Sequence, residues 1–266
     1  MKLTVITVCY QAEAVIRPTI ESVLSQDGID MEYRIIDGAS KDRTVAIAEE
    51  YRPAFEKKGI PFFITSEPDK GIYDAMNKGI RQAEGEFLSF MNAGDRFFSP
   101  HSAREALQGA QDADVVYGYA ILALSGHYKK HFPDPLETLN EHMAFNHQSS
   151  FVRRTQAQKL MFRTEYRLGA DYDMMLRLYR EGGRFCYVPV PVAVYDMAGV
   201  SETNALSTQE ETLRVRHANG IPPKPEEQQD QKKIMRFVRR RVSSPLPSIY
   251  ALCFSTVPIN SSMPSF

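Results

Sequence analysis

Asp95 is the first of two aspartates in this chain whose surroundings suit a chemical role. It closes a turn of small residues, 92–95 (NAGD), and that turn follows the short apolar run 87–91 (FLSFM). A carboxylate held in such a turn can approach a divalent cation, which prefers oxygen ligands, together with the phosphates that the cation neutralises. An aspartate after a strand can also simply cap the next turn, so the turn alone leaves both roles open.

Asp171 is the second, and its surroundings suit proton transfer. It stands in the sequence 168–173 (LGADYD), directly before an expected helix that runs to Arg180. A carboxylate within hydrogen-bond reach of a hydroxyl can accept its proton as the hydroxyl attacks. The alternative is a helix N-cap, whose loss typically costs about 1 kcal/mol. Asp173 is expected to be structural instead, because Arg177 follows it at the i,i+4 spacing of a helical ion pair.

Apolar runs and helix-forming segments indicate the elements that must position these aspartates. The expected strands are short and bounded by polar turns: 3–8, 32–36, 62–65, 87–91 and 114–119. The expected helices are 13–26, 43–51, 74–83, 174–180 and 206–219. Strands that alternate with helices predict an α/β fold with a single doubly wound, mostly parallel sheet flanked by helices. In such a sheet a ligand binds beyond the carboxyl ends of the strands, so polar residues that emerge there are candidates for binding.

Composition and missing motifs exclude several classes of protein. The 266 residues allow one large domain, or one domain with an appendage, and the net charge of -1 gives no general attraction for nucleic acid. No G-x-G-x-x-G follows the first strand and no G-x-x-x-x-G-K-[ST] occurs, so the dinucleotide fingerprint and the P-loop are both absent. The three cysteines lie far apart without metal-type spacing and fit a reducing compartment. We therefore expect a cytoplasmic protein.

Three segments resemble family 2 inverting glycosyltransferases of the bacterial polysaccharide type. They are 7–26 (TVCYQAEAVIRPTIESVLSQ), 35–44 (IIDGASKDRT) and 67–95 (EPDKGIYDAMNKGIRQAEGEFLSFMNAGD), in the order and at the spacing of that family. The resemblance implies a glycosyltransferase A-type fold. It also implies a metal-dependent, inverting enzyme that transfers a sugar from a UDP- or GDP-sugar to a hydroxyl of a glycan or lipid-linked acceptor, in cell-surface polysaccharide biosynthesis. Mg²⁺ or Mn²⁺ is the implied cofactor.

The resemblance also assigns roles to individual residues by their match to the family motifs. Donor binding falls to Thr7, Tyr10, Asp37, Asp69, Gly71 and Asn92, metal binding to Asp95, and the catalytic base to Asp171. His147 and Gln148, in the sequence HQSSF, are expected to contact the acceptor or the diphosphate; a hydrogen-bonded core histidine is the open alternative for His147. Gly38 departs from the family pattern, because many members have a second aspartate there. Asn92 and Gly94 replace acidic residues of a D-x-D motif, so Asp95 is the main carboxylate of the metal turn.

The C-terminal region differs in character from the rest of the chain. The expected organisation is a catalytic domain over 1–205, with a nucleotide-sugar half at 1–100 and an acceptor half at 101–205, followed by a helical, basic extension over 206–266. Segment 232–242 (KKIMRFVRRRV) mixes apolar residues with six cations, and no charged residue follows it. A basic amphipathic helix can lie on an anionic membrane, so we expect peripheral attachment to the inner face of the cell membrane. A helix docked on the domain is the open alternative.

Two other functions are compatible with these residues. The chain could bind nucleotide sugars without turning them over, because its metal turn is poor in acidic residues. It could also be a nucleotidyltransferase, which uses a similar α/β sheet. Those enzymes usually carry a Gly-rich basic loop after the first strand, and 9–18 (CYQAEAVIRP) is not such a loop. Hydrolysis of nucleotide sugars with and without Mn²⁺ would separate the three functions.

Overall fold

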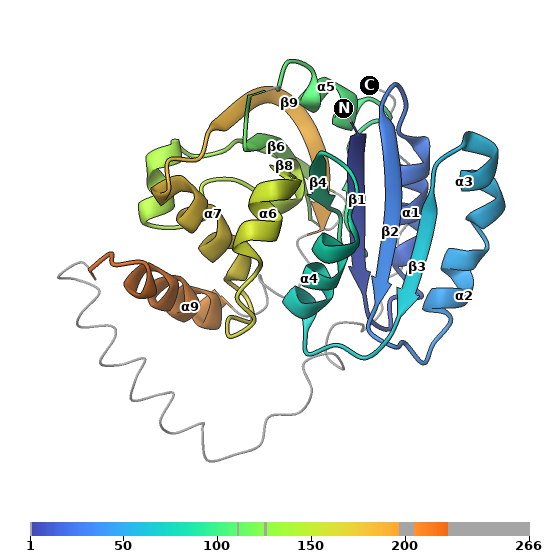
Figure 1. Ribbon diagram of the computed structural model, residues 1–266, viewed down its shortest axis with the longest axis horizontal. Helices are drawn as coiled ribbons and strands as arrows, with labels where there is room; N and C mark the ends of the chain where they lie inside the picture. Colours follow the sequence, from blue (N-terminus) through green and yellow to red (C-terminus); the bar gives the residue numbers. More distant parts are fainter. Residues whose placement is uncertain (1, 111, 125–126, 197–204, 223–266) are drawn as a thin grey trace, which may run out of the picture.

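Strand β1 (Lys2–Cys9) is buried on both sides, and its side chains alternate between two cores. Leu3, Val5 and Cys9 belong to one buried cluster, whereas Ile6 and Val8 belong to the other. Since successive side chains of a strand point to opposite faces, a strand that is apolar at nearly every position needs helices on both faces. The computed structural model, which describes residues 2–110, 112–124, 127–196 and 205–222, has this arrangement (Figure 1).

Four strands form the parallel half of the sheet. β2 (Asp30–Asp37) and β4 (Phe87–Phe90) flank β1, and β3 (Phe62–Ser66) lies beyond β2. The register aligns Cys9 with Asp37, and Asp37 with Ser66. The loops that leave these strands therefore meet at one edge of the sheet, as the sequence predicts.

The other half of the nine-stranded sheet is mixed. β8 (Ser150–Arg153) pairs antiparallel with β4, β6 (Val115–Leu124) pairs antiparallel with β8, and β9 (Phe185–Asp196) pairs parallel with β6. β5 (Arg96–Phe97) pairs antiparallel with β9, and β7 (His127–His131) with β6. Only residues 125–126 separate β6 from β7, and so short a connection permits antiparallel pairing alone. The expected α/β sheet flanked by helices is confirmed, with its continuous run of parallel strands in the first half.

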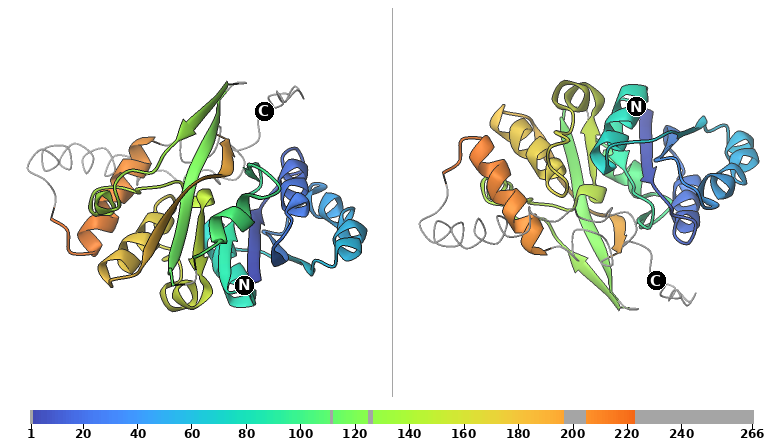
Figure 2. Two further views of the ribbon diagram at one scale, coloured as in Figure 1. Left: turned by 90° about the horizontal axis from the view of Figure 1, so that it is seen from above. Right: turned by 90° about the horizontal axis from the view of Figure 1, so that it is seen from below.

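Helices cover both faces of the sheet. They are α1 (Ile16–Ser25), α2 (Thr44–Glu49), α3 (Arg52–Lys58), α4 (Ile72–Gln82), α5 (Ser102–Leu107), α6 (Arg154–Leu160), α7 (Ala170–Arg180) and α9 (Ala205–Ala218), with 3-10 turns η1 (Leu136–Asn140) and η2 (His147–Ser149). α1, α2, α3 and α5 bury side chains in the core of Leu3 and Val5, and α4, α6, α7 and α9 bury theirs in the core of Ile6 and Val8. Figure 2 shows α6, α7 and α9 on one side of the sheet and α1 to α3 on the other.

The sequence predicts one helix over 43–51, and the structure has two shorter helices in this region. α2 ends at Glu49, and α3 begins at Arg52 with Pro53 in its first turn. Proline lacks an N–H and has a fixed φ, so it fits the start of a helix. Gly59, with a φ of 70°, ends α3 in the left-handed conformation. α3 buries Phe55, and a single buried apolar residue shows no helical periodicity, so the sequence gives no signal for this helix.

Helix α9 confirms the helix expected over 206–219, and it begins and ends one residue earlier than expected. Val215 buries its side chain in the same core as α7. The basic segment 232–242 and the uncharged tail after it lie outside the described residues. Within residues 2–110, 112–124, 127–196 and 205–222, none of the helices combines the length and apolarity that crossing a bilayer requires.

Candidate active site

Three loops meet beyond the carboxyl ends of β1, β2 and β3, and they bring Tyr10, Gly38 and Asp69 together. A Cβ placed on Gly38 would lie 2.6 Å from Oδ2 of Asp69 and 3.2 Å from Cδ2 of Tyr10. The Gly38 N–H also donates to the carbonyl oxygen of Cys9 (2.9 Å). A side chain at position 38 would therefore displace the Asp69 carboxylate, which explains why glycine stands where the family pattern offers a second aspartate.

Asp37 organises these loops from the interior. Its carboxylate accepts hydrogen bonds from the Ser40 N–H (2.9 Å), from the Ser40 hydroxyl and from the Ser66 hydroxyl (2.6 Å). Asp37 is fully buried, so it ties the turn after β2 to the end of β3. Burial, and then the charge of Asp37, raises the pKa of the adjacent Cys9 thiol well above its ordinary value, which makes Cys9 a packing residue. A direct contact between Asp37 and a donor would require one of the carboxylate's hydrogen bonds to be exchanged.

Thr7 does not reach this edge of the sheet, contrary to the expectation that it binds the donor. Its hydroxyl donates to the carbonyl oxygen of Met91 (2.7 Å), and the Tyr33 hydroxyl lies 2.9 Å from Thr7 Oγ1. Strand alternation explains the position, because Thr7 points to the same face as Val5, beneath α1, and is fully buried there. Thr7 therefore links the strands to one another, and its position does not support a donor contact.

The loop before α4 has a fixed shape that leaves its backbone open to a ligand. Asp69 Oδ1 accepts a hydrogen bond from the Gly71 N–H (2.9 Å), and Asp74 Oδ2 accepts one from the Lys70 N–H (3.0 Å). Gly71 has a φ of 124°, and a Cβ there would meet nothing within 4 Å. Glycine allows both the unusual φ and a close approach of ligand to backbone. The structure thus places Asp69 and Gly71 where the sequence predicts donor binding, next to Tyr10.

The small-residue turn after β4 is anchored from two sides. On one side the Thr19 hydroxyl, from α1, donates to the Asp95 carbonyl oxygen (2.6 Å) and accepts a hydrogen bond from the Gly94 N–H (3.0 Å). On the other side Gln148 Nε2 donates to Asp95 Oδ2 (3.0 Å). Asp95 is buried, so its carboxylate has a defined position at the end of β4, against the η2 turn.

Asn92 and Asp95 offer the oxygen ligands that Mg²⁺ and Mn²⁺ bind. Asn92 Oδ1 is buried and makes no hydrogen bond within the described residues. An orphaned carbonyl oxygen on the same turn as a buried carboxylate fits a divalent cation. No group of three or more His, Cys, Asp and Glu side chains among the described residues could enclose an ion. The turn therefore fits a cation whose other ligands come from a diphosphate and from water.

His147 is buried beside Gln148 with both ring nitrogens lacking a hydrogen-bond partner in the described part of the chain. Its ring stacks on Phe90 (centroids 5.4 Å apart) and meets Phe162 edge-on (6.1 Å). Burial lowers the pKa of His147 below its ordinary value, and the charge of Asp171 opposes that shift, so the imidazole is neutral at pH 7. Among the described residues nothing hydrogen-bonds this ring, so they give no support to the alternative of a hydrogen-bonded core histidine. A buried polar ring without partners is expected where a polar ligand completes the site.

Asp171 lies in the first turn of α7, where Tyr73 of α4 holds its carboxylate. The N-cap of α7 is Gly169, so Asp171 is not the cap. The Tyr73 hydroxyl donates to Asp171 Oδ1 (3.0 Å). Burial, and then the charge of Asp171, raises the pKa of Tyr73 well above its ordinary value, so the phenol remains a donor. Asp171 itself is partly exposed, as a group that receives a proton from a substrate must be.

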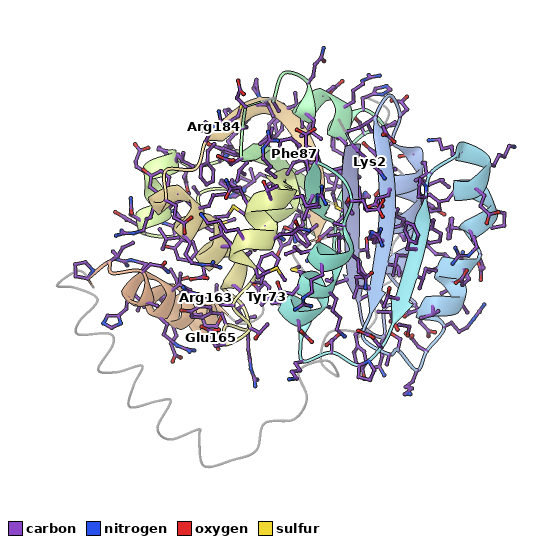
Figure 3. The ribbon with its side chains drawn as sticks, viewed as in Figure 1. Lys2, Tyr73, Phe87, Arg163, Glu165 and Arg184 are labelled. Carbon is purple, nitrogen blue, oxygen red and sulfur yellow. The ribbon has the colours of Figure 1, made fainter. Side chains whose placement is uncertain are left out.

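His147 and Gln148, which are adjacent in the η2 turn, each interact with one of the two candidate aspartates. Gln148 donates a hydrogen bond to Asp95, and the charge of Asp171 acts on the pKa of His147. In Figure 3, Tyr73 lies away from Lys2 and Phe87, which mark the amino ends of β1 and β4. The site therefore lies toward the opposite end of these strands, where the sequence predicts it.

Asp173 has the structural role that the sequence predicts. It is fully buried, and its carboxylate pairs with Arg177 Nε (2.8 Å) and with Arg163 (3.3 Å). The i,i+4 pair with Arg177 is confirmed.

Two residues of α4 support the site beyond those that the sequence predicts. Tyr73 holds Asp171. Asn77 pairs with the backbone of Phe162, donating from Nδ2 to its carbonyl oxygen (2.8 Å) and accepting from its N–H (2.9 Å). Tyr73 and Asn77 share one face of the helix because they are four residues apart. A buried amide on an otherwise apolar face is the signal that could have identified Asn77.

Known proteins resemble this chain in sequence and in fold. The family model described as glycosyl transferase family 2 matches residues 4–199. The PGL/p-HBAD biosynthesis glycosyltransferase of Mycobacterium tuberculosis is 31% identical over 196 residues, covering 71% of this chain and 75% of the relative. TarS from S. aureus, solved with UDP-GlcNAc, has a TM-score of 0.66 at 18% identity and covers 91% of this chain and 73% of its own. The mannosyltransferase PcManGT from Pyrobaculum calidifontis, solved with GDP-Man and Mn²⁺, has a TM-score of 0.62 at 17% identity, covering 82% and 63%. Both structures support the fold.

Proposed function

The chain belongs to glycosyl transferase family 2, and we propose that it transfers a sugar, with inversion, from a UDP- or GDP-sugar to a hydroxyl of a glycan or lipid-linked acceptor. The arrangement around Asp171 carries this proposal. A partly exposed carboxylate is held by the Tyr73 hydroxyl at 3.0 Å, and Gln148 fixes the carboxylate of Asp95 in the neighbouring turn.

Asp171 acts as the general base. It accepts the proton of the acceptor hydroxyl as that oxygen forms a bond to the anomeric carbon of the donor sugar. The bond from the anomeric carbon to the diphosphate breaks on the opposite face, and the nucleoside diphosphate leaves with the electron pair. This single displacement inverts the anomeric centre. Tyr73 keeps the carboxylate oriented throughout, since its raised pKa keeps the phenol protonated.

Asn92 and Asp95 would hold a divalent cation beside the diphosphate. A bound Mg²⁺ or Mn²⁺ supplies Lewis-acid stabilisation of the charge that develops there. The orphaned Asn92 Oδ1 supports this role, and Gln148 fixes the Asp95 carboxylate for it. The Mn²⁺ and GDP-Man bound by PcManGT show that a protein of this fold uses such an ion with a nucleotide sugar.

Tyr10, Asp69 and Gly71 form the donor side of the site, and Asp37 fixes its shape. Gly71 offers open backbone, and Asp69 and Tyr10 lie together over Gly38. Held in this way, a donor would present its anomeric carbon to the acceptor with little loss of orientation during the reaction. His147, with its two unpartnered nitrogens, would complete its hydrogen bonds on the acceptor or on the diphosphate.

The proposal has two further parts. The first is that the acceptor is an intermediate in the synthesis of a cell-surface polysaccharide or glycolipid. The second is that the enzyme works at the inner face of the cell membrane. The biosynthetic role in the name of the mycobacterial relative supports the first part. The six cations of segment 232–242 support the second. Full-length protein should cosediment with vesicles that contain anionic lipid, less so as salt rises, and a chain truncated after Pro225 should not. Equal sedimentation of the two forms would contradict the membrane role and leave the enzymatic one intact.

A donor screen tests the function itself. The full chain is incubated with UDP-GlcNAc or GDP-mannose, with Mn²⁺, with Mg²⁺ or with a chelator, and release of nucleoside diphosphate is followed. We expect slow release from one donor class, stimulated by the cation, because water replaces the acceptor. Binding of a donor with no release under any of these conditions, and none after acceptor glycans are added, would favour a protein that binds nucleotide sugars without turnover.

A further inference from the structure

The loop that leads into α7 presents three successive backbone N–H groups to one carboxylate. Glu211 Oε2 accepts hydrogen bonds from Arg167 (2.9 Å), Leu168 (2.7 Å) and Gly169 (2.9 Å), and its Oε1 also lies 2.9 Å from the Arg167 nitrogen. α7 begins at Ala170 with Gly169 as its N-cap, so these three N–H groups belong to the loop that enters the helix and to the N-cap itself. Buried backbone N–H groups need a hydrogen-bond partner. Glu211 provides one from a distant helix and so fixes the loop directly before α7.

Glu211 is well placed to fix this loop firmly. It comes from α9, 42 residues further along the chain than Gly169, and its side chain is buried. A buried carboxylate is stable where N–H groups surround it and where the positive end of a helix dipole lies nearby. Gly169 has room for this contact, with Glu211 Cβ 3.5 Å from the position of a Cβ.

Asp171 lies two residues beyond the last of these N–H groups. A second contact from the same region follows it, because Asn219 Nδ2 donates to Asp173 Oδ1 (3.0 Å). The chain is thus held to α9 through its backbone before Asp171, and to the residue after α9 through the side chain of Asp173 beyond it. On the third side Tyr73 fixes the carboxylate itself. Tyr73 belongs to a different helix, α4, so a shift of the loop would move the Asp171 carboxylate relative to the Tyr73 hydroxyl.

We propose that Glu211 is a positioning residue for the base, so that α9, expected as an appendage, is part of the catalytic apparatus. This inference rests on the proposed role of Asp171. Glu211 touches neither donor nor acceptor, and it acts by holding residues 167–169 so that Asp171 meets the acceptor hydroxyl. A misplacement of about 1 Å can cost on the order of 10²-fold in rate.

The test replaces the carboxylate in the full chain. Glu211→Gln keeps the size of the side chain but puts an NH₂ group, which cannot accept a hydrogen bond, in one of the two oxygen positions. Glu211→Asp keeps the carboxylate but shortens the side chain by one methylene, which moves the carboxylate away from the N–H groups of residues 167–169. It remains informative if Glu211→Gln does not fold. Glu210→Gln is the matched control, because Glu210 is the neighbouring acid of the same helix and accepts none of the three N–H bonds.

Donor affinity and turnover are measured separately on folded protein. For Glu211→Gln we expect a fall in kcat of about 10- to 10²-fold, with the affinity for UDP or GDP and Mn²⁺ within about twofold of the wild type. Glu211→Asp should lie between, and Glu210→Gln should match the wild type. Wild-type kcat per folded molecule in both Glu211 variants would overturn the proposal, as would equal losses of donor affinity and kcat. Asp171→Asn is measured beside them: wild-type turnover in that variant would refute the proposed role of Asp171 as the base, whereas an inactive Asp171→Asn with both Glu211 variants fully active would refute only the positioning role.

Discussion

Gly38→Ala should weaken donor binding through Asp69, although alanine adds a single methyl group. The new Cβ would lie 2.6 Å from Asp69 Oδ2, and ordinary contact begins at 3.4 Å, so the oxygen must retreat by about 0.8 Å. That movement turns Asp69 Oδ1 away from Gly71, whose N–H donates a hydrogen bond to it (2.9 Å). Hydrogen bonds to charged groups contribute about 1.5–3 kcal/mol. Asp69 is partly exposed, and water can replace part of the bond. We therefore expect a loss of about 1 kcal/mol, or roughly fivefold in affinity for UDP or GDP.

A double-mutant cycle measured by calorimetry isolates this effect. The four proteins are the wild type, Gly38→Ala, Asp69→Ala and the double variant, each titrated with UDP or GDP in the presence of Mn²⁺. Once Asp69 is truncated, the nearest remaining contact of the new Cβ is Tyr10 Cδ2 at 3.2 Å, which is much less severe. Gly38→Ala should then change affinity by less than about twofold, which gives a clear coupling energy. Equal effects of Gly38→Ala in both backgrounds, or none in the wild type, would refute the steric reasoning. Thermal unfolding of each variant controls for loss of folded protein.

Three further predictions concern Asp95, Tyr73 and His147. Asp95→Ala should lose the Mn²⁺-dependent part of the affinity for a nucleoside diphosphate in calorimetry, and an unchanged affinity would show that the cation binds elsewhere. Tyr73→Phe should lower kcat about tenfold, because a hydrogen bond worth about 1.5 kcal/mol to a charged group is lost, while donor affinity stays the same; steady-state kinetics would expose a parallel loss of affinity. Burial lowers the pKa of His147 from its ordinary 6.5, so the unfolded chain binds the proton more readily and folded stability falls as pH drops below 6.5. The thermal midpoint should therefore fall less between pH 7.5 and 5.5 in His147→Gln than in the wild type, and identical slopes would contradict a neutral buried imidazole.

The parts of the site that follow from strand order could be predicted from the sequence. Asp37 is the last residue of β2, Asp69 and Asp95 lie in the loops that follow β3 and β4, and parallel strands bring such positions to one edge of the sheet. Gly38 could be noticed as a departure from the family pattern. The reason for glycine at this position could not be predicted, because it depends on where the carboxylate of Asp69 points. Thr7 was placed wrongly, although strand alternation, counted from Val5, assigns it to the interior.

The contacts that hold Asp171 could not be predicted from the sequence. Tyr73 is 98 residues away from Asp171, and Glu211 is 42 residues away from Gly169. Both contacts depend on how α4 and α9 pack against α7. The spacing of apolar residues in a sequence predicts which face of a helix is buried, but not which helix packs against that face. The antiparallel pairing of β8 with β4 is likewise set by the packing of the second half of the sheet. Asp171 could be proposed as the base from its place in the sequence, and tertiary packing determines how its carboxylate is held.

The most direct measurement of the central claim compares donor binding with turnover in Asp171→Asn. The two side chains are nearly equal in size, and asparagine can still accept the hydrogen bond from Tyr73, but it cannot take a proton from the acceptor. We expect unchanged affinity for UDP or GDP with Mn²⁺, and a fall in release of nucleoside diphosphate of about 10²- to 10⁴-fold, the usual contribution of a general base. Turnover close to that of the wild type, in a variant that binds the donor normally, would show that Asp171 is not the base.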